Sequence, residues 1–155
     1  MRIHKSIEIA APAVKIWPFL TEPTKILRWC PVETIRHTSP QQSGLNTPFY
    51  FEERVIGRLL RMNFVVTEWV MNQRVAFKMT SGNIVKGYEQ LYTIQPTASG
   101  SQFTCFEDVK LPYGLIGKAT GFFRRFTSEA RLETMLVKLK LLAETYEADV
   151  SLCSE

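Results

Sequence analysis

The chain has 155 residues, 45% of them hydrophobic and 22% charged, a composition typical of one soluble globular domain over residues 1–155. The net charge of +4 is small and spread along the chain, which gives no reason to expect nucleic acid as a partner. No apolar run approaches the ~20 residues that span a bilayer, and the start of the chain lacks signal-peptide character, so we expect a cytoplasmic protein.

The cysteines and histidines exclude the common metal sites. The three cysteines are widely separated and form no Cys-x-x-Cys pair, so reduced thiols are expected instead of a disulfide or a zinc site. Only two histidines are present, which argues against a histidine-based metal centre. No glycine-rich phosphate loop or dinucleotide motif occurs, and we therefore expect no metal and no cofactor.

The first nine residues alternate between apolar and polar side chains. Ile3, Ile7 and Ile9 fall on one side, and His4 falls on the other. A two-residue period is typical of a half-buried strand, so residues 1–9 are predicted to form one, with His4 in solvent.

Two short helices are predicted to follow this strand. Pro12 can occupy the first turn of a helix, where its missing N–H has no cost, but Pro18 predicts a break or an early start. Residues 24–29 form the second helix, which ends at Pro31. No crossover is long enough for a parallel βαβ unit, which argues against a doubly wound fold.

Strand-like runs separated by short turns dominate the middle of the chain. Turn-forming residues lie between successive runs, and connections this short favour an antiparallel meander. With the first strand added, the sheet has about seven strands and should twist and curl. The predicted runs cover residues 32–38, 47–55, 59–71, 74–80, 85–94 and 102–111.

A long amphipathic helix is predicted over residues 112–148. Its apolar stripe shifts at Ser128, Glu129 and Arg131, which divides it into two halves. Glycines weaken the first half, which should be less stable and could be kinked, although close packing on a sheet would also explain them. The helix is the only element large enough to fill the concave face of the sheet, so an α+β, helix-grip architecture is expected. The glycines are Gly114, Gly117 and Gly121.

The only local cluster of positive charge lies on this helix. It contains Arg124, Arg125 and Arg131. Exposed arginines commonly serve only to solvate a helix face, and this is how we interpret all three.

Several segments resemble the START-like, or Bet v 1-like, helix-grip superfamily, and within it the polyketide cyclase/dehydrase-like (SRPBCC) branch. The resemblance covers nearly the whole chain and implies shape more than chemistry. It implies a cavity between sheet and helix that accepts a hydrophobic small molecule. The segments are residues 7–17 (IEIAAPAVKIW), 29–31 (WCP), 65–69 (VVTEW), 74–77 (RVAF) and the leucine-rich last helix.

Aromatic residues fill one alternating set of positions on several strands. Such residues line ligand pockets, although a filled core of the same aromatics is the alternative. Phe122 and Phe126 would border the mouth, and the glycine-rich half of the helix would form a gate. The strand residues predicted to contact a ligand are Phe49, Phe51, Phe77, Met79, Tyr88, Tyr92 and Phe103.

Two glutamates lie on the same side of their strands as these aromatic residues. Glu53 follows Phe51, and Glu107 follows Phe103 at the same alternation. A buried carboxylate needs a partner or a proton, which makes either Glu a candidate acid or base. Both lie near strand ends, so a solvated side chain is the ordinary interpretation. His37 has the opposite parity from Val32 and is expected to be exposed.

Three functions remain open. The first is binding of a hydrophobic or amphipathic small molecule, such as a lipid, a polyketide or an aromatic compound. The second is a cyclase or dehydrase that uses Glu53 or Glu107 in the same cavity. The third is an interaction module that binds another protein through its sheet or through the Phe122–Phe126 patch. The sequence leaves the oligomeric state open.

Overall fold

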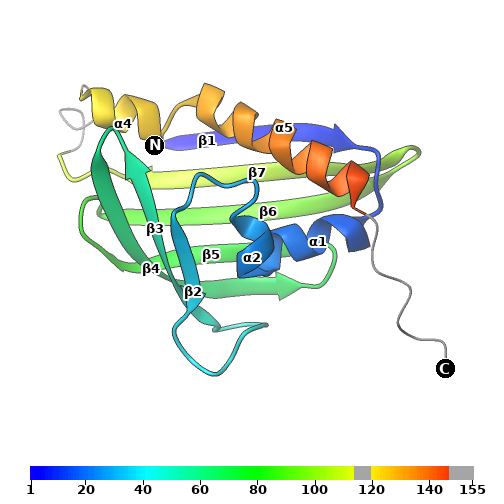
Figure 1. The fold of residues 1–155 in the computed structure, drawn as a ribbon, viewed down its shortest axis with the longest axis horizontal. Helices are drawn as coiled ribbons and strands as arrows, with labels where there is room; N and C mark the ends of the chain where they lie inside the picture. The colour runs from blue at the N-terminus through cyan, green and yellow to red at the C-terminus, as the bar shows by residue number, and fades with distance from the viewer. Residues whose placement is uncertain (114–119, 147–155) are drawn as a thin grey trace.

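A seven-stranded antiparallel sheet forms the body of the protein (Figure 1). The computed structural model describes residues 1–113 and 120–146. The strand order is β1-β7-β6-β5-β4-β3-β2, so consecutive strands pair as a meander and β1 closes onto β7, as expected from the short turns. The strands are β1 (Arg2–Ile9), β2 (Thr34–His37), β3 (Pro48–Val55), β4 (Arg58–Val70), β5 (Arg74–Gly82), β6 (Gly87–Thr97) and β7 (Gly100–Lys110).

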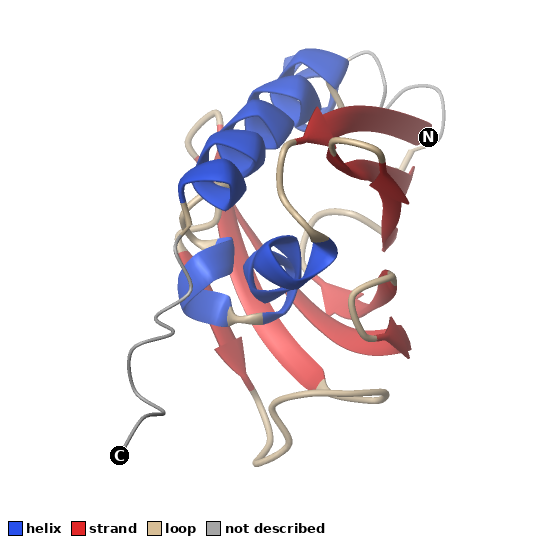
Figure 2. Ribbon diagram, turned by 90° about the vertical axis from the view of Figure 1, so that its right-hand side faces the viewer, coloured by secondary structure: helices blue, strands red, loops and turns tan. Residues whose placement is uncertain are grey.

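Irregular pairing along β4 favours curvature of the sheet. Its register with β5 shifts between Asn63 and Phe64, and again between Val66 and Glu68. An extra residue on one strand of a pair bends that strand and increases its twist. The sheet therefore has a concave face, over which the helices pack (Figure 2).

Gly100 joins β6 to β7 at a point where no other residue fits. Its φ is +153°, and a Cβ at this position would lie 2.2 Å from the Ile9 carbonyl oxygen. The close approach lets the β6–β7 turn pack against the end of β1. A glycine is required here because the nearest atoms belong to the backbone and cannot rotate away.

The two helices after β1 are α1 (Ala13–Thr21) and α2 (Pro23–Ile26). Pro18 does not break α1, so the predicted break is wrong; the helix begins at Ala13, directly after Pro12. The missing N–H leaves only the Val14 carbonyl without its helical partner, and Val14 is exposed, so solvent can reach that end of the helix. Pro23 occupies the first turn of α2, where proline is favoured.

The C-terminal helix of the grip is divided at the predicted changeover. The long C-terminal helix is present as predicted, but it is interrupted at Thr127 and Ser128 and consists of α4 (Gly121–Phe126) and α5 (Glu129–Thr145). The Thr127 hydroxyl donates to the Phe123 carbonyl, and the Ser128 hydroxyl accepts a 3.0 Å hydrogen bond from the Arg131 amide. These bonds satisfy backbone groups at the end of α4 and the start of α5. Gly114 and Gly117 lie outside the described residues.

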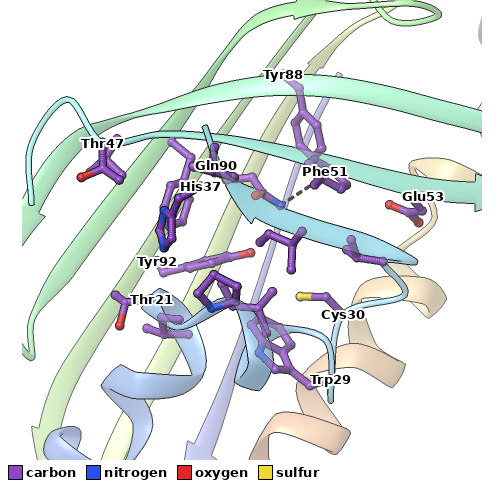
Figure 3. Close-up of a pocket in the computed structure, with 18 of the residues that line it drawn as sticks. Thr21, Trp29, Cys30, His37, Thr47, Phe51, Glu53, Tyr88, Gln90 and Tyr92 are labelled. Carbon is purple, nitrogen blue, oxygen red and sulfur yellow. Dashed lines mark hydrogen bonds between the residues drawn. The ribbon is translucent and has the colours of Figure 1, made fainter. Parts of the chain in front are cut away.

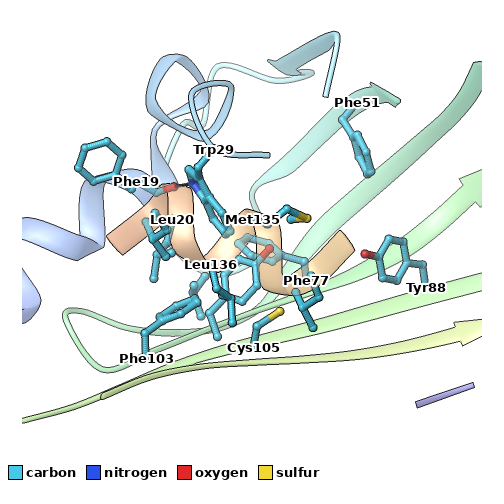
Figure 4. Packing of buried hydrophobic residues seen from close by; sticks show 14 of the residues in the cluster. Phe19, Leu20, Trp29, Phe51, Phe77, Tyr88, Phe103, Cys105, Met135 and Leu136 are labelled. Carbon is cyan, nitrogen blue, oxygen red and sulfur yellow. Dashed lines mark hydrogen bonds between the residues drawn. The ribbon is translucent and has the colours of Figure 1, made fainter. Parts of the chain in front are cut away.

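Side chains from the helices and the sheet meet in one hydrophobic core (Figure 4). Trp29 is 1% exposed, its ring lies near those of Tyr92 and Phe103, and its Nε1 donates a 2.8 Å hydrogen bond to the Phe19 carbonyl. This bond ties the segment after α2 to α1. No helix within the described parts of the chain is long and apolar enough to cross a membrane.

Candidate functional site

A cavity lies between the concave face of the sheet and the helices α1, α2 and α5 (Figure 3). Its volume is about 70 Å³ for a water-sized sphere, and all space between the lining atoms, including the part open to solvent, is about 770 Å³. Most lining residues are apolar or aromatic. They are Leu20, Thr21, Pro23, Ile26, Trp29, Cys30, Pro31, Val32, Ile35, His37, Gln42, Thr47, Phe49, Phe51, Glu53, Val66, Trp69, Phe77, Tyr88, Gln90, Tyr92, Arg131 and Met135.

The predicted site residues divide into those that line this cavity and those that pack behind it. The lining includes Phe49, Phe51, Phe77, Tyr88, Tyr92 and Glu53. Met79, Phe103, Phe122, Phe126 and Glu107 are not part of the lining. Phe103 is fully buried against Trp29 and Tyr92, so at this end the concave face is filled. The aromatic alternation therefore marks both a core and a cavity.

The helix α4 does not form the mouth of this cavity. Phe122, Phe123 and Phe126 are buried, and the Phe126 ring lies edge-on to Tyr88 at 5.7 Å. The predictions of a mouth beside these residues, and of an exposed Phe122–Phe126 patch for a protein partner, are wrong.

The fully exposed lining residues lie at a different place. Pro31 precedes β2, and Gln42 lies in the loop of residues 39–47; Pro23 and Ile26 on α2 and His37 at the end of β2 are partly exposed. The cavity accordingly opens between α2, β2 and this loop.

Glu53 and Arg131 form a buried ion pair in the cavity wall. Arg131 Nη2 lies 2.7 Å from each Glu53 carboxylate oxygen, and its Nε lies 3.1 Å from Oε1. The Glu53 side chain is 3% exposed and the Arg131 side chain 14%. Arg131 is thus not on a solvated helix face, and Glu53 does not reach solvent, so both interpretations from sequence are wrong.

Arg131 lies in the first turn of α5. Its amide is capped by Ser128 at the start of α5, and its guanidinium lies 5.2 Å from the centre of the Phe126 ring. Burial lowers the pKa of Arg131, but Glu53, together with Tyr88 and Glu107, outweighs that effect, and the net shift is upward. Burial raises the pKa of Glu53, and Arg131 opposes the rise. The guanidinium therefore stays charged beside the carboxylate.

Glu107 belongs to the same polar cluster, although it lies behind the lining. It is 2% exposed, contrary to the solvated interpretation, and accepts a 3.0 Å hydrogen bond from Gln90 Nε2. The Gln90 amide also donates to the Tyr88 hydroxyl at 2.8 Å. Burial, and then the Glu107 charge, raise the pKa of Tyr88 well above its ordinary value. The Tyr88 hydroxyl thus stays protonated and has its own hydrogen to donate.

Sequence reasoning missed several residues of the lining. His37 is half-buried and lines the cavity, so its predicted exposure is wrong. Trp29 and Cys30 follow α2, and no periodicity marks them as cavity residues. Burial raises the pKa of Cys30 well above its ordinary value, so its thiol is a poor nucleophile near neutral pH. The Trp29-Cys-Pro segment was the available signal, but it indicated only the fold.

Solved structures of other proteins share the fold of this chain. Its fold matches a START superfamily protein from Mycobacterium smegmatis at 16% identity and a TM-score of 0.75, covering 92% of this chain and 97% of that one. A protein from Thermus thermophilus matches at 17% identity and a TM-score of 0.74, covering 92% of this chain and 97% of that one. A protein from Nitrosomonas europaea matches at 19% identity and a TM-score of 0.66, covering 92% of this chain and 93% of that one. These likenesses show the fold alone.

A search of curated proteins finds no match to this sequence. The family model described as polyketide cyclase / dehydrase and lipid transport matches residues 1–144. That match covers every element of the sheet and nearly all of α5. The chain therefore belongs to the polyketide cyclase/dehydrase and lipid transport family, within the START-like fold.

Proposed function

We propose that this protein binds a hydrophobic or amphipathic small molecule in the cavity between the sheet and the helices. The observation that carries the proposal is the lining, in which apolar and aromatic side chains surround a few polar groups at fixed positions. Small-molecule sites have this composition because apolar burial supplies the free energy and polar groups set the orientation. The family description, which includes lipid transport, supports the same interpretation.

The size of the cavity sets a condition on binding. A space of about 70 Å³ holds a few water molecules, whose share of the liquid is about 30 Å³ each. A small aromatic molecule fits only within the larger space that includes the opening. Binding therefore requires side chains at the mouth, on α2, β2 and the 39–47 loop, to move outward.

Blocking the mouth provides the test. Ile35 lies on β2 and lines the cavity, whereas its neighbour Arg36 is exposed. We expect Ile35→Trp to weaken binding of the neutral fluorescent probe 6-propionyl-2-dimethylaminonaphthalene by about tenfold or more, equivalent to about 1.4 kcal/mol. Titration followed by the blue shift of the probe's emission measures the affinity.

Arg36→Trp is the matched control, since it adds the same ring to the opposite side of the same strand. Its affinity should stay within about twofold of that of the unmodified protein, below ~0.5 kcal/mol. Equal losses in the two variants, or no saturable binding to the unmodified protein, would refute the proposal.

An acid–base enzyme is the second candidate, favoured by the burial of Glu53 in the lining. Among the described residues that line the cavity, Glu53 is the carboxylate, and burial raises its pKa, which makes it a stronger base. If it acts as a base, the protein should speed exchange of the α-hydrogens of 2-propionylnaphthalene for deuterium, followed by NMR. Glu53→Gln should slow this exchange by about 100-fold or more, within the range for a positioned base.

The control for this experiment is Glu89→Gln, because Glu89 is exposed on β6. It should leave the exchange rate unchanged. A rate equal to that in buffer, or one unaffected by Glu53→Gln, would eliminate the enzymatic alternative and leave the binding proposal intact.

A further inference from the structure

Two buried polar atoms lack hydrogen-bond partners among residues 1–113 and 120–146. They are Arg131 Nη1 and His37 Nδ1, and both residues line the cavity. A buried polar atom without a partner costs about 1–3 kcal/mol, so native proteins seldom leave one unpaired. That both occur on the lining of one cavity indicates that its occupant supplies the partners.

The contacts of Arg131 define which kind of hydrogen-bond partner Nη1 requires. Nε and Nη2 bind Glu53, and the Phe126 ring lies beside the guanidinium, which leaves the hydrogens of Nη1 for another acceptor. A guanidinium nitrogen donates and never accepts. The occupant must therefore present an acceptor atom, such as an oxygen, at this end.

The charges around Arg131 decide whether that oxygen is neutral or anionic. Within the part of the chain that the structure describes, Arg131 is the only cation that lines the cavity, and Glu53 already pairs with it. The Glu107 carboxyl is near enough to interact electrostatically with the same guanidinium. A ligand carboxylate would be the third acidic group around one cation, in a site where like charges repel strongly. A neutral carbonyl oxygen satisfies Nη1 without this cost.

His37 marks the other end of the cavity. It pairs with Phe49 on β3, four residues before Glu53 on the same strand, which separates the two positions by about 13 Å at ~3.3 Å per residue. Figure 3 shows His37 and Glu53 on opposite sides of the lining, with Gln90 and Phe51 between them. Burial lowers the pKa of His37, so the ring is neutral near pH 7. A hydroxyl suits a neutral imidazole nitrogen in either tautomer, because it both donates and accepts.

We infer that the ligand is an uncharged, elongated, apolar molecule with a polar oxygen at each end: a carbonyl that accepts from Arg131 Nη1, and a hydroxyl that binds His37 Nδ1. This inference rests on the proposed function and adds the chemical class of the ligand. It excludes fatty acids and other carboxylates as the preferred ligands.

Four naphthalenes of similar size test it at pH 7.5: 2-butylnaphthalene, 2-propionylnaphthalene, 6-propionyl-2-naphthol and 6-hydroxy-2-naphthoate. We expect affinity to rise about tenfold with the ketone and about tenfold again with the hydroxyl, each step equal to ~1.4 kcal/mol. The naphthoate should bind at least about tenfold more weakly than the hydroxy-ketone. Fluorescence titration or calorimetry gives each dissociation constant.

Two variants assign each gain to its residue. His37→Phe preserves the ring and should abolish the gain from the hydroxyl, so that the variant binds 6-propionyl-2-naphthol and 2-propionylnaphthalene with equal affinity. The double variant Glu53→Met/Arg131→Met removes the donor without leaving a buried charge and should abolish the gain from the ketone.

The outcomes separate this inference from the function on which it rests. If none of the four compounds binds, the proposed function fails. If 2-butylnaphthalene binds and the oxygens add nothing, or if the naphthoate binds best, the binding function stands and the two-ended, uncharged ligand is refuted. In that case cavity water would be the partner of both nitrogens.

Discussion

Replacing Arg131 with Met should lower the free energy of unfolding by about 3–5 kcal/mol, the usual loss when one partner of a buried ion pair is removed. The Glu53 side chain is only 3% exposed, and two nitrogens of Arg131 hold its carboxylate. Without them the carboxylate stays buried and unpaired, or takes up a proton. Urea unfolding measures the loss. The slope of the free energy of unfolding against urea concentration should be the same in the variant and in the unmodified protein.

The double variant Glu53→Met/Arg131→Met is the control, because it removes both charges and replaces them with side chains that fill the space. Its stability should lie within about 1–2 kcal/mol of that of the unmodified protein, or above it, since apolar replacement of a buried pair is often neutral or stabilising. A double variant as unstable as Arg131→Met would show that the loss comes from packing and not from the unpaired carboxylate.

The pH dependence of Arg131→Met gives a second, independent readout. In this variant burial raises the pKa of Glu53 without the opposing guanidinium, while in the unfolded chain it stays near ~4.3. The folded state then binds more protons than the unfolded state between these two pKa values, so its stability falls as pH rises through that window. The deficit relative to the unmodified protein should be smaller at pH 5 than at pH 8. A deficit independent of pH would contradict the buried-carboxylate explanation.

Trp29→Ala should destabilise the protein by about 3–5 kcal/mol, the usual cost of removing a large buried aromatic side chain. Trp29 is 1% exposed, packs near Tyr92 and Phe103, and donates to the Phe19 carbonyl. Domains of this kind have a total stability of about 5–15 kcal/mol, so the loss is a large share of it. Urea denaturation again provides the measurement.

The same substitution should enlarge the cavity, because Trp29 is part of its lining. Trp29→Ala should therefore bind neutral apolar probes too bulky for the unmodified protein. Val14→Ala, at a position 62% exposed, is the control and should change stability by less than about 0.5 kcal/mol. Similar losses at both positions, or no gain in bulky-probe binding, would refute the role given to Trp29.

The pattern of the sequence was sufficient to predict the strands and their inward-facing sides. In β7 the buried positions 101, 103, 105, 107 and 109 alternate as the two-residue period requires. The same alternation placed Glu53 beside Phe51 on the inner side of β3. Solvation near a strand end was the wrong inference for both carboxylates, because strand parity fixes the side on which a residue lies but not what covers it.

In the C-terminal helix, too, the sequence predicted one feature and missed another. The shift of the apolar stripe predicted a changeover at Ser128, Glu129 and Arg131, and Ser128 is the N-cap of α5. It could not predict that Arg131 turns inward, because an arginine in the first turn of a helix usually reaches solvent. Its burial depends on Glu53, 78 residues away in the sequence and brought beside it by the fold.

Local periodicity therefore determined the meander, the order of its elements and the inward side of each strand, since these follow from side-chain spacing along a single segment. The tertiary structure alone decided where the cavity opens, which aromatics line it and which only fill the core, and which charges pair inside it. Those features depend on distances between segments remote in sequence, such as β2 with α2, or β3 with α5. A two-residue or 3.6-residue period carries no information about such distances.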